Sequence, residues 1–249
     1  MNHRSEQIGF SQRVHLEWFE HTANLILAGN DKPTIESDLQ RILRTKVSVG
    51  GNAQRGNREK IITILTKVWL NVPKSLKPLR DDGLELLRNI RGDERIALHW
   101  GMVMAVYPFW GAVASHVGRL LKLQGTCAAL HIQRRVREQY GERETVSRAA
   151  RRVIRSLMDW RVLNETGKKG VYEMGLSVSL NQLRTISWLF EASLHARSIT
   201  SAQVVDLAEH PSLFPFIIPH VSADRLAANS ERLELFRQGL DQDLLMSRQ

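Results

Sequence analysis

Hydrophobic residues recur at helical spacing along most of this chain, and glycines, prolines or short polar stretches separate the runs. The runs predict helices over 11–28, 34–43, 58–71, 81–90, 93–105, 111–123, 126–139, 144–160, 179–197 and 201–209, with a further turn or two in 222–229. Thr34, Asp93 and Thr126 are expected to be helix N-caps, because their side-chain oxygens can accept hydrogen bonds from free amide groups. The first hundred residues show no strand-like alternation, and we see no internal repeat. The pattern therefore predicts a mainly α protein.

Breaks in this pattern divide the chain into three expected domains, over 1–110, 111–175 and 176–249. We expect a helical bundle, an embedded winged helix-turn-helix, and a small C-terminal helical extension with a β-hairpin. Three prolines exclude regular helix from 210–220 and predict an extended segment that covers a neighbouring core. Alternation around Leu233 predicts a strand, and Gly239 a turn toward Leu244.

The span 96–118 lacks Lys, Arg, Asp and Glu and is long enough to cross a membrane. Pro108 near its middle, together with His99 and His116, favours two buried core helices that meet at Tyr107 and Pro108. We therefore expect no membrane partner. The first ten residues also lack the apolar core of a signal peptide, and the chain has a single cysteine, so we expect a reducing cytoplasm.

The most informative stretch is 144–174, which reads as a two-faced helix running into a short hairpin. Arg148, Arg151, Arg152 and Arg155 share one stripe of that helix, while apolar residues from Ala150 to Met158 form the other. A polar turn, Asn164 to Lys169, then separates two short apolar runs. A helix followed by such a hairpin is typical of a winged-helix nucleic-acid reader, with 111–123 and 126–139 as its first two helices.

Charge supports this interpretation. The formal net charge is +9, and residues 134–170 hold 11 lysines and arginines against 5 acidic residues. Such a concentration attracts polyanions, with nucleic acid the first partner to consider and anionic lipid the second. We predict that duplex DNA is contacted by Arg134, Arg135, Arg148, Arg151, Arg152, Arg155, Lys168 and Lys169.

Other readings of the same residues stay open. The basic helix could be a solvated surface, and many winged helices bind only proteins, which makes a scaffold subunit the main alternative. Single-stranded RNA binding is less favoured, because aromatic residues make up only 6% of the chain and no aromatic-studded sheet is expected.

The sequence offers little support for catalysis, a cofactor or a metal. Gly50, Gly51 and Gly56 precede a helix, but no GK[ST] follows, so an ordinary loop is expected. The histidines lack ligand spacing, and the acidic pairs Asp81/Asp82 and Glu231/Glu234 read as caps or solvated faces. Cys127 is expected at a helix start, yet no histidine partner is recognisable. We expect a non-enzymatic protein with no cofactor.

The stretch 126–163, with Thr145-Val146-Ser147-Arg148 opening its basic helix and Asp159-Trp160-Arg161-Val162-Leu163 closing it, resembles BrxA, the small protein of bacterial BREX phage-exclusion systems. Ala97-Leu98-His99-Trp100 through Tyr107-Pro108-Phe109 and the early helices also look like that family, over about residues 10–165. The resemblance implies a helical, DNA-binding, non-enzymatic accessory role in phage defence, alongside other defence proteins. The C-terminal stretch with Phe214-Pro215-Phe216 and residues 236–241 departs from that family's layout.

Overall fold

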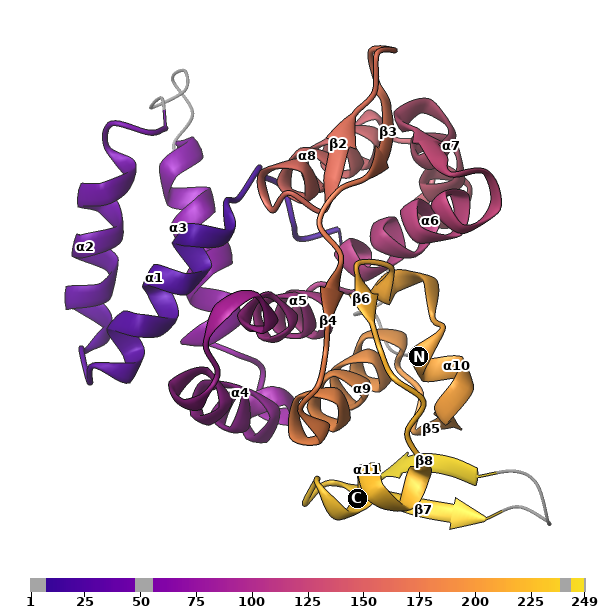
Figure 1. Cartoon of the computed structure of the whole chain (residues 1–249). Helices are drawn as coiled ribbons and strands as arrows, with labels where there is room; N and C mark the ends of the chain where they lie inside the picture. The colour runs from indigo at the N-terminus through magenta and orange to yellow at the C-terminus, as the bar shows by residue number, and fades with distance from the viewer. Residues whose placement is uncertain (1–7, 48–55, 238–242, 249) are drawn as a thin grey trace.

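The computed structural model of the chain describes residues 8–47, 56–237 and 243–248. Its helices are α1 (Leu16–Leu27), α2 (Lys32–Leu43), α3 (Asn57–Trp69), α4 (Lys77–Asn89), α5 (Arg95–Val106), α6 (Pro108–Gln124), α7 (Ala129–Tyr140), α8 (Glu144–Asp159), α9 (Leu183–Arg197), α10 (Val204–Ala208) and α11 (Ala223–Ala228). The 3-10 turns are η1 (Lys74–Leu76), η2 (Gly92–Glu94) and η3 (Pro211–Leu213). The strands are β1 (Thr126–Ala128), β2 (Leu163–Glu165), β3 (Val171–Met174), β4 (Val178–Ser179), β5 (Ser201–Gln203), β6 (Phe216–Ile217), β7 (Leu233–Arg237) and β8 (Asp243–Ser247). Helices dominate (Figure 1), which confirms the mainly α class.

The segment before α1 is extended, so the predicted helix start at residue 11 is wrong. Phe10, Gln12 and Val14 are buried and alternate with exposed neighbours, as in a strand. The Val14 amide donates to Ser156 Oγ at 2.9 Å, and the Val14 carbonyl accepts from the Trp160 indole at 3.0 Å. These two bonds hold the extended segment against the end of α8.

The three predicted N-caps are also wrong. Asp31 caps α2, because its carboxylate accepts from the Thr34 amide at 3.0 Å. Asp93 lies within η2, so α5 begins at Arg95 without a side-chain cap. Thr126 begins β1 rather than a helix, since residues 126–128 pair with β3, and α7 starts three residues later.

Helices α5 and α6 form the centre of the core and meet at Tyr107 and Pro108 with a bend of 119°, as the sequence predicted. Trp100 packs edge-on against Trp110 with ring centroids 4.4 Å apart, and Trp160 after α8 lies 5.6 Å from Trp110. Within the described ranges, neither helix nor any other is long and apolar enough by itself to cross a membrane; α5 and α6 would reach that length only together and sharply bent.

Helices α6, α7 and α8 are followed by the predicted hairpin, which lies beside them (Figure 1). Its second strand, β3, is the middle of an antiparallel sheet of order β1-β3-β2. Strand β1 was not predicted, because three residues are too few to show an alternating pattern. Cys127 of β1 lies opposite Tyr172 of β3, and both side chains are buried.

The C-terminal part repeats this order of elements. Helix α9 is followed by β5, α10, α11, β7 and β8, and the antiparallel sheet has the order β5-β8-β7, again with its last strand in the middle. Residues 201–203, expected to be helical, form β5 and lead directly into α10, as β1 leads into α7. The repeat is one of topology without visible sequence similarity. The predicted strand around Leu233 is confirmed as β7, and it pairs with β8 as the expected C-terminal hairpin requires, whereas Gly239 lies outside the described residues.

The proline-containing stretch 210–220 leaves this repeat between α10 and α11 and covers α6, as expected, although it includes η3 and β6. The close approach requires Gly118, since a Cβ at that position would lie 2.0 Å from the Pro211 carbonyl oxygen. The Trp100 indole donates to the Ser212 carbonyl at 3.0 Å. One continuous set of buried apolar residues runs from Phe10 to Leu245. The division into three domains therefore stays a prediction.

Candidate nucleic-acid interface

Helix α8 has one buried face and one cationic face. Its buried residues, at helical spacing, include Val146, Ala150, Val153, Ile154 and Leu157. Arg148, Arg151 and Arg155 are exposed on the opposite side, and Arg152 at its edge is half-buried. Packing of the apolar stripe against α6 and α7 thus fixes the direction in which the arginines point.

The four guanidinium groups lie close enough to affect one another. Burial, and then the neighbouring charges of Arg155, Arg148 and Arg151, lower the pKa of Arg152. Glu144 pairs with Arg148 at 2.7 Å one turn earlier, which raises the pKa of the arginine. Because both partners of that pair are largely exposed, it adds little stability, and the arginine is available to another anion.

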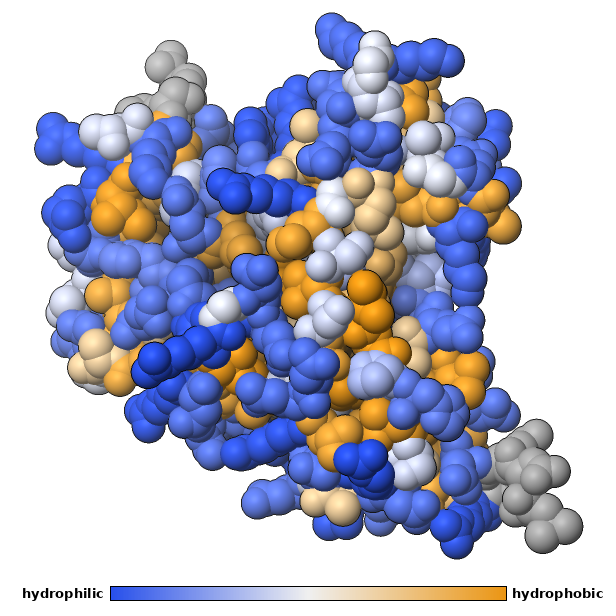
Figure 2. Space-filling view, viewed as in Figure 1, coloured by the Kyte–Doolittle hydropathy of each residue, from blue (hydrophilic) through white to orange (hydrophobic). Residues whose placement is uncertain are grey.

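The hairpin presents the two predicted lysines at its tip. Lys168 and Lys169 are exposed, and hydrophilic residues cover the tip in the view of Figure 2. Backbone bonds order the turn: the Thr166 amide donates to the Val171 carbonyl at 2.9 Å. The Gly170 amide donates to Glu165 at 2.8 Å, with Gly170 at the positive φ of 75°. A turn held in this way presents its lysines at a fixed place beside α8.

A shallow cavity of about 430 Å³ joins the helix to the hairpin. Its lining includes Arg155 of α8, Lys169 of the hairpin and Arg13 of the N-terminal segment. Glu165 also lines it, so the cavity contains three basic side chains and one acidic side chain. The structure thus brings together one predicted residue from each element and adds a cation from far away in the sequence.

Arg13 is the residue that sequence reasoning missed. It forms a bidentate ion pair with Asp159 at the end of α8, and His15 lies 3.5 Å from the same carboxylate. The hydrogen bond to Asp159 raises the pKa of Arg13, although burial opposes it. Gln12 is buried beside Arg13 although it is polar, so the sequence shows no apolar-polar alternation that would have indicated an extended segment here.

Arg134 and Arg135 form a separate group on α7. Arg135 binds Glu138 at 3.0 Å, and Arg134 approaches the same carboxylate at 3.8 Å. Arg135 also lines a groove between α6 and α7 together with Arg119. These two arginines therefore share a carboxylate on their own helix, and Arg135 faces α6 rather than the α8 stripe.

The remaining sequence candidates have structural roles. Cys127 lies inside β1 rather than at a helix start, and burial raises the pKa of its thiol to about 12, which leaves it a poor nucleophile. Asp82 pairs with Arg232 at 2.7 Å. Across the described ranges, no group of three or more His, Cys, Asp or Glu side chains is arranged to hold a metal. Gly50 and Gly51 lie outside the described residues.

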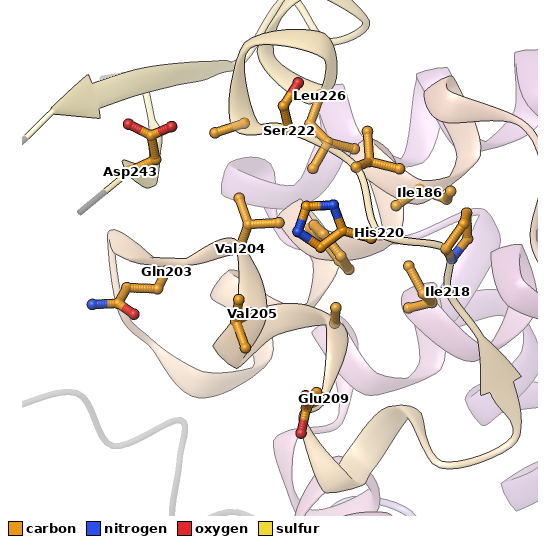
Figure 3. Close-up of a pocket in the computed structure, with 15 residues that line it drawn as sticks. Ile186, Gln203, Val204, Val205, Glu209, Ile218, His220, Ser222, Leu226 and Asp243 are labelled. Atoms are coloured by element: carbon orange, nitrogen blue, oxygen red, sulfur yellow. The ribbon is translucent and has the colours of Figure 1, made fainter. Parts of the chain in front are cut away.

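A cavity of about 400 Å³ opens in the C-terminal repeat, where α10 and α11 have 5 and 6 residues against 12 and 16 for α7 and α8. Figure 3 shows His220 extending into it among Ile186, Val204 and Ile218. Residues of α9, α10 and α11 line this cavity.

No family model matches the chain, and comparison with curated proteins and with solved structures also found no match.

Proposed function

We propose that this protein binds duplex DNA through a winged helix formed by residues 108–174, with α8 as its recognition helix and the β2–β3 hairpin as its wing. The order α6, β1, α7, α8, β2, β3 and the strand order β1-β3-β2 support the assignment. Arg148, Arg151, Arg152 and Arg155 would contact phosphates or guanine edges, while Lys168 and Lys169 would reach the adjacent backbone or groove.

The observation that carries this proposal is the outward direction of the α8 arginines. Arg151 and Arg155 form no ion pair within 4 Å with any carboxylate of the described chain, and Glu144, the partner of Arg148, comes from the same helix. Unbalanced cations on a rigid helix suit a polyanion.

We further propose that the C-terminal repeat, residues 183–247, is a second winged helix that does not read DNA. Its counterpart of α8, α11, has one arginine, Arg225, next to Asp224, and its strand β7 ends in Arg237, which pairs with that same aspartate at 3.1 Å. DNA contact is thus assigned to the first unit alone. The resemblance to the BrxA family supports an accessory role in phage defence.

The test is a titration of labelled duplex DNA followed by fluorescence anisotropy at several salt concentrations. If the four α8 arginines and two wing lysines each neutralise about one phosphate, the log-log slope of the binding constant against salt is about −5. Arg151→Gln combined with Arg155→Gln should weaken binding and bring the slope to about −4 or shallower. A salt-independent affinity would overturn the proposal.

Arg88→Gln combined with Arg91→Gln is the matched control, because Arg88 in the last turn of α4 and Arg91 just after it are both exposed. Helix α4 lies far from the hairpin tip in Figure 1. This control removes the same charge and should leave DNA affinity nearly unchanged. Equal weakening by both pairs would mean that net charge, not α8, determines binding.

A scaffold subunit is the second candidate function. The observation in its favour is the pair Leu123 and Leu130, which are 76% and 78% exposed at the adjoining ends of α6 and α7. Exposed apolar side chains that form one patch mark a site of protein contact, and these two leucines would be the start of such a patch. A partner protein that copurifies with the chain, in the absence of any shift of labelled DNA, would favour this function.

A further inference from the structure

The two repeated units meet at a cavity of about 380 Å³. From the first unit, α6 contributes His116 and Arg119, and the end of α7 contributes Gln139. From the second, the end of α9 contributes Arg197, and the turn before η3 contributes His210. Met104, Pro108 and Ala112 supply an apolar floor. A volume of this size lies in the range of small-molecule sites, which begins at about 300 Å³.

The described side chains that line this cavity include basic residues but no acidic ones. It contains two arginines and two histidines, and among the described residues no aspartate or glutamate lines it. Neither Arg119 nor Arg197 has a carboxylate partner within 4 Å in the described part of the chain. The nearest acids that act on the cavity are Asp206, whose charge acts on Arg197 and His210, and Glu138, whose charge acts on His116.

His210 caps η3, and the hydrogen bond of this cap determines which ring nitrogen carries the proton. Its Nδ1 accepts a hydrogen bond from the Ser212 amide at 3.3 Å, with Ser212 Oγ 2.7 Å away. Because Nδ1 is an acceptor, the neutral ring carries its proton on Nε2. Burial, and then the charges of Arg197 and Arg119, lower the pKa of His210 to about 4, so the ring is a neutral donor near pH 7. The same causes, burial first and then Arg119, lower the pKa of His116.

From this geometry we propose that the cavity between the two repeats binds the phosphate monoester group of a small organic molecule. Arg119 and Arg197 would hold the phosphate from two sides, and His210 Nε2–H would donate to it. Two guanidinium forks and a neutral N–H donor match the several acceptor oxygens of a dianion. The apolar floor would cover part of the molecule that carries the phosphate.

A DNA backbone phosphate is the other source of this chemistry, and the shape of the site argues against it. The phosphate would sit in a hollow beside apolar Met104 and Ala112, between two units, whereas duplex phosphates lie on an open convex surface. The site is also built from different residues than the α8 stripe, so the two kinds of binding can be separated by substitution.

Isothermal titration calorimetry on the full chain with inorganic phosphate, adenosine monophosphate and adenosine provides the test. We expect both phosphates to bind, the nucleotide more tightly, and adenosine not to bind. Arg119→Gln and Arg197→Gln should each weaken nucleotide binding by about tenfold or more, since a hydrogen bond to a charged group contributes about 1.5–3 kcal/mol. His210→Asn keeps an acceptor for the Ser212 amide but removes the Nε2–H donor, so weaker binding with an unchanged melting temperature is expected.

Arg225→Gln is the matched control, because Arg225 is an exposed arginine of the same repeat that does not line the cavity. Its nucleotide affinity should equal that of the unchanged chain. Arg151→Gln combined with Arg155→Gln should leave nucleotide binding intact, so the site can exist even if α8 does not bind DNA. The proposal is overturned if neither phosphate binds, if Arg119→Gln and Arg197→Gln leave affinity unchanged, or if they weaken only duplex DNA binding.

Discussion

A partly buried carboxylate, Glu20, bonded to residues of α5 beside α3, predicts that the protein loses stability in acid. Glu20 accepts from His99 Nε2 at 2.7 Å and from Arg95 Nε at 2.9 Å. His99 Nδ1 accepts from the Trp69 indole at 3.1 Å, so the histidine is neutral, with its proton on Nε2. Although burial opposes them, the bonds from His99 and Arg95 lower the pKa of Glu20 from 4.5 to about 2.

The magnitude follows from that shift. Lowering the pKa of Glu20 from 4.5 to about 2 can contribute at most about 3 kcal/mol to the free energy of unfolding. The Glu20 side chain is 30% exposed, so solvent screening reduces the contribution, and we expect about 1–3 kcal/mol. The folded pKa is the lower one, so this stability is complete above 4.5 and is lost as the pH falls from 4.5 toward 2.

His99 also lowers the stability of the folded chain in acid, and its effect begins at a higher pH than that of Glu20. Burial lowers the pKa of His99 below its usual 6.5 in the folded chain. Below that pH the unfolded chain binds a proton that the folded chain does not, so stability already declines there as the solution becomes more acidic. Both groups therefore act in the same direction, His99 first and Glu20 second.

Urea unfolding of the unchanged chain and of Glu20→Gln, from about pH 7 to about pH 3, measures the effect. Glutamine can still accept from His99 but has no charge to lose. The variant should be less stable than the unchanged chain near neutral pH, and the difference should shrink in acid. Glu36→Gln, an exposed change on α2, should show neither effect. A stability difference between Glu20→Gln and the unchanged chain that is the same at both ends of the pH range would refute the reasoning.

Three further predictions concern packing. Gly118→Ala should lower the free energy of unfolding by about 2 kcal/mol or more, measured by urea titration, because the new Cβ would meet an η3 carbonyl oxygen at 2.0 Å. Gly175→Ala should destabilise the hairpin and weaken DNA binding in the anisotropy assay, because its Cβ would lie 2.2 Å from the Arg161 carbonyl oxygen; Gly167→Ala, with nothing within 4 Å, should do neither. Cys127 should react with a thiol reagent at neutral pH only at the rate of unfolding, since it is buried and its pKa is raised to about 12.

The two faces of α8 could be predicted from the sequence because they depend on local periodicity alone. The spacing of Val146, Ala150, Val153 and Leu157 determines which side is buried, and the arginines then point outward wherever the helix lies in the fold. The hairpin after it was predictable for a similar reason, since its strands are joined by a short polar turn. Both are features that a short stretch of chain specifies by itself.

Features that depend on distant partners were missed. Strand β1 exists because residues 126–128 pair with β3 more than forty positions later, and in isolation they continue the helical pattern of α7. The segment around Arg13 is extended because its backbone bonds to Ser156 and Trp160. Thr34 was wrong for a local reason, since Asp31, three residues earlier, accepts from its amide. In the other two cases, pairing with a distant part of the chain determines the structure.

The topological repeat was invisible for a different reason. The two units share strand order and connection, but α10 and α11 are less than half as long as α7 and α8, so no helical period aligns them. Topology depends on which strands pair, and quite different side chains satisfy the same pairing, as Tyr172 opposite Cys127 and Leu245 opposite Ala202 do. The positions of charged residues are even less constrained by the topology, because they lie on outer faces that do not pack in the core. The first unit therefore carries a cationic stripe on α8, and the second carries none on α11, although both have the same strand order.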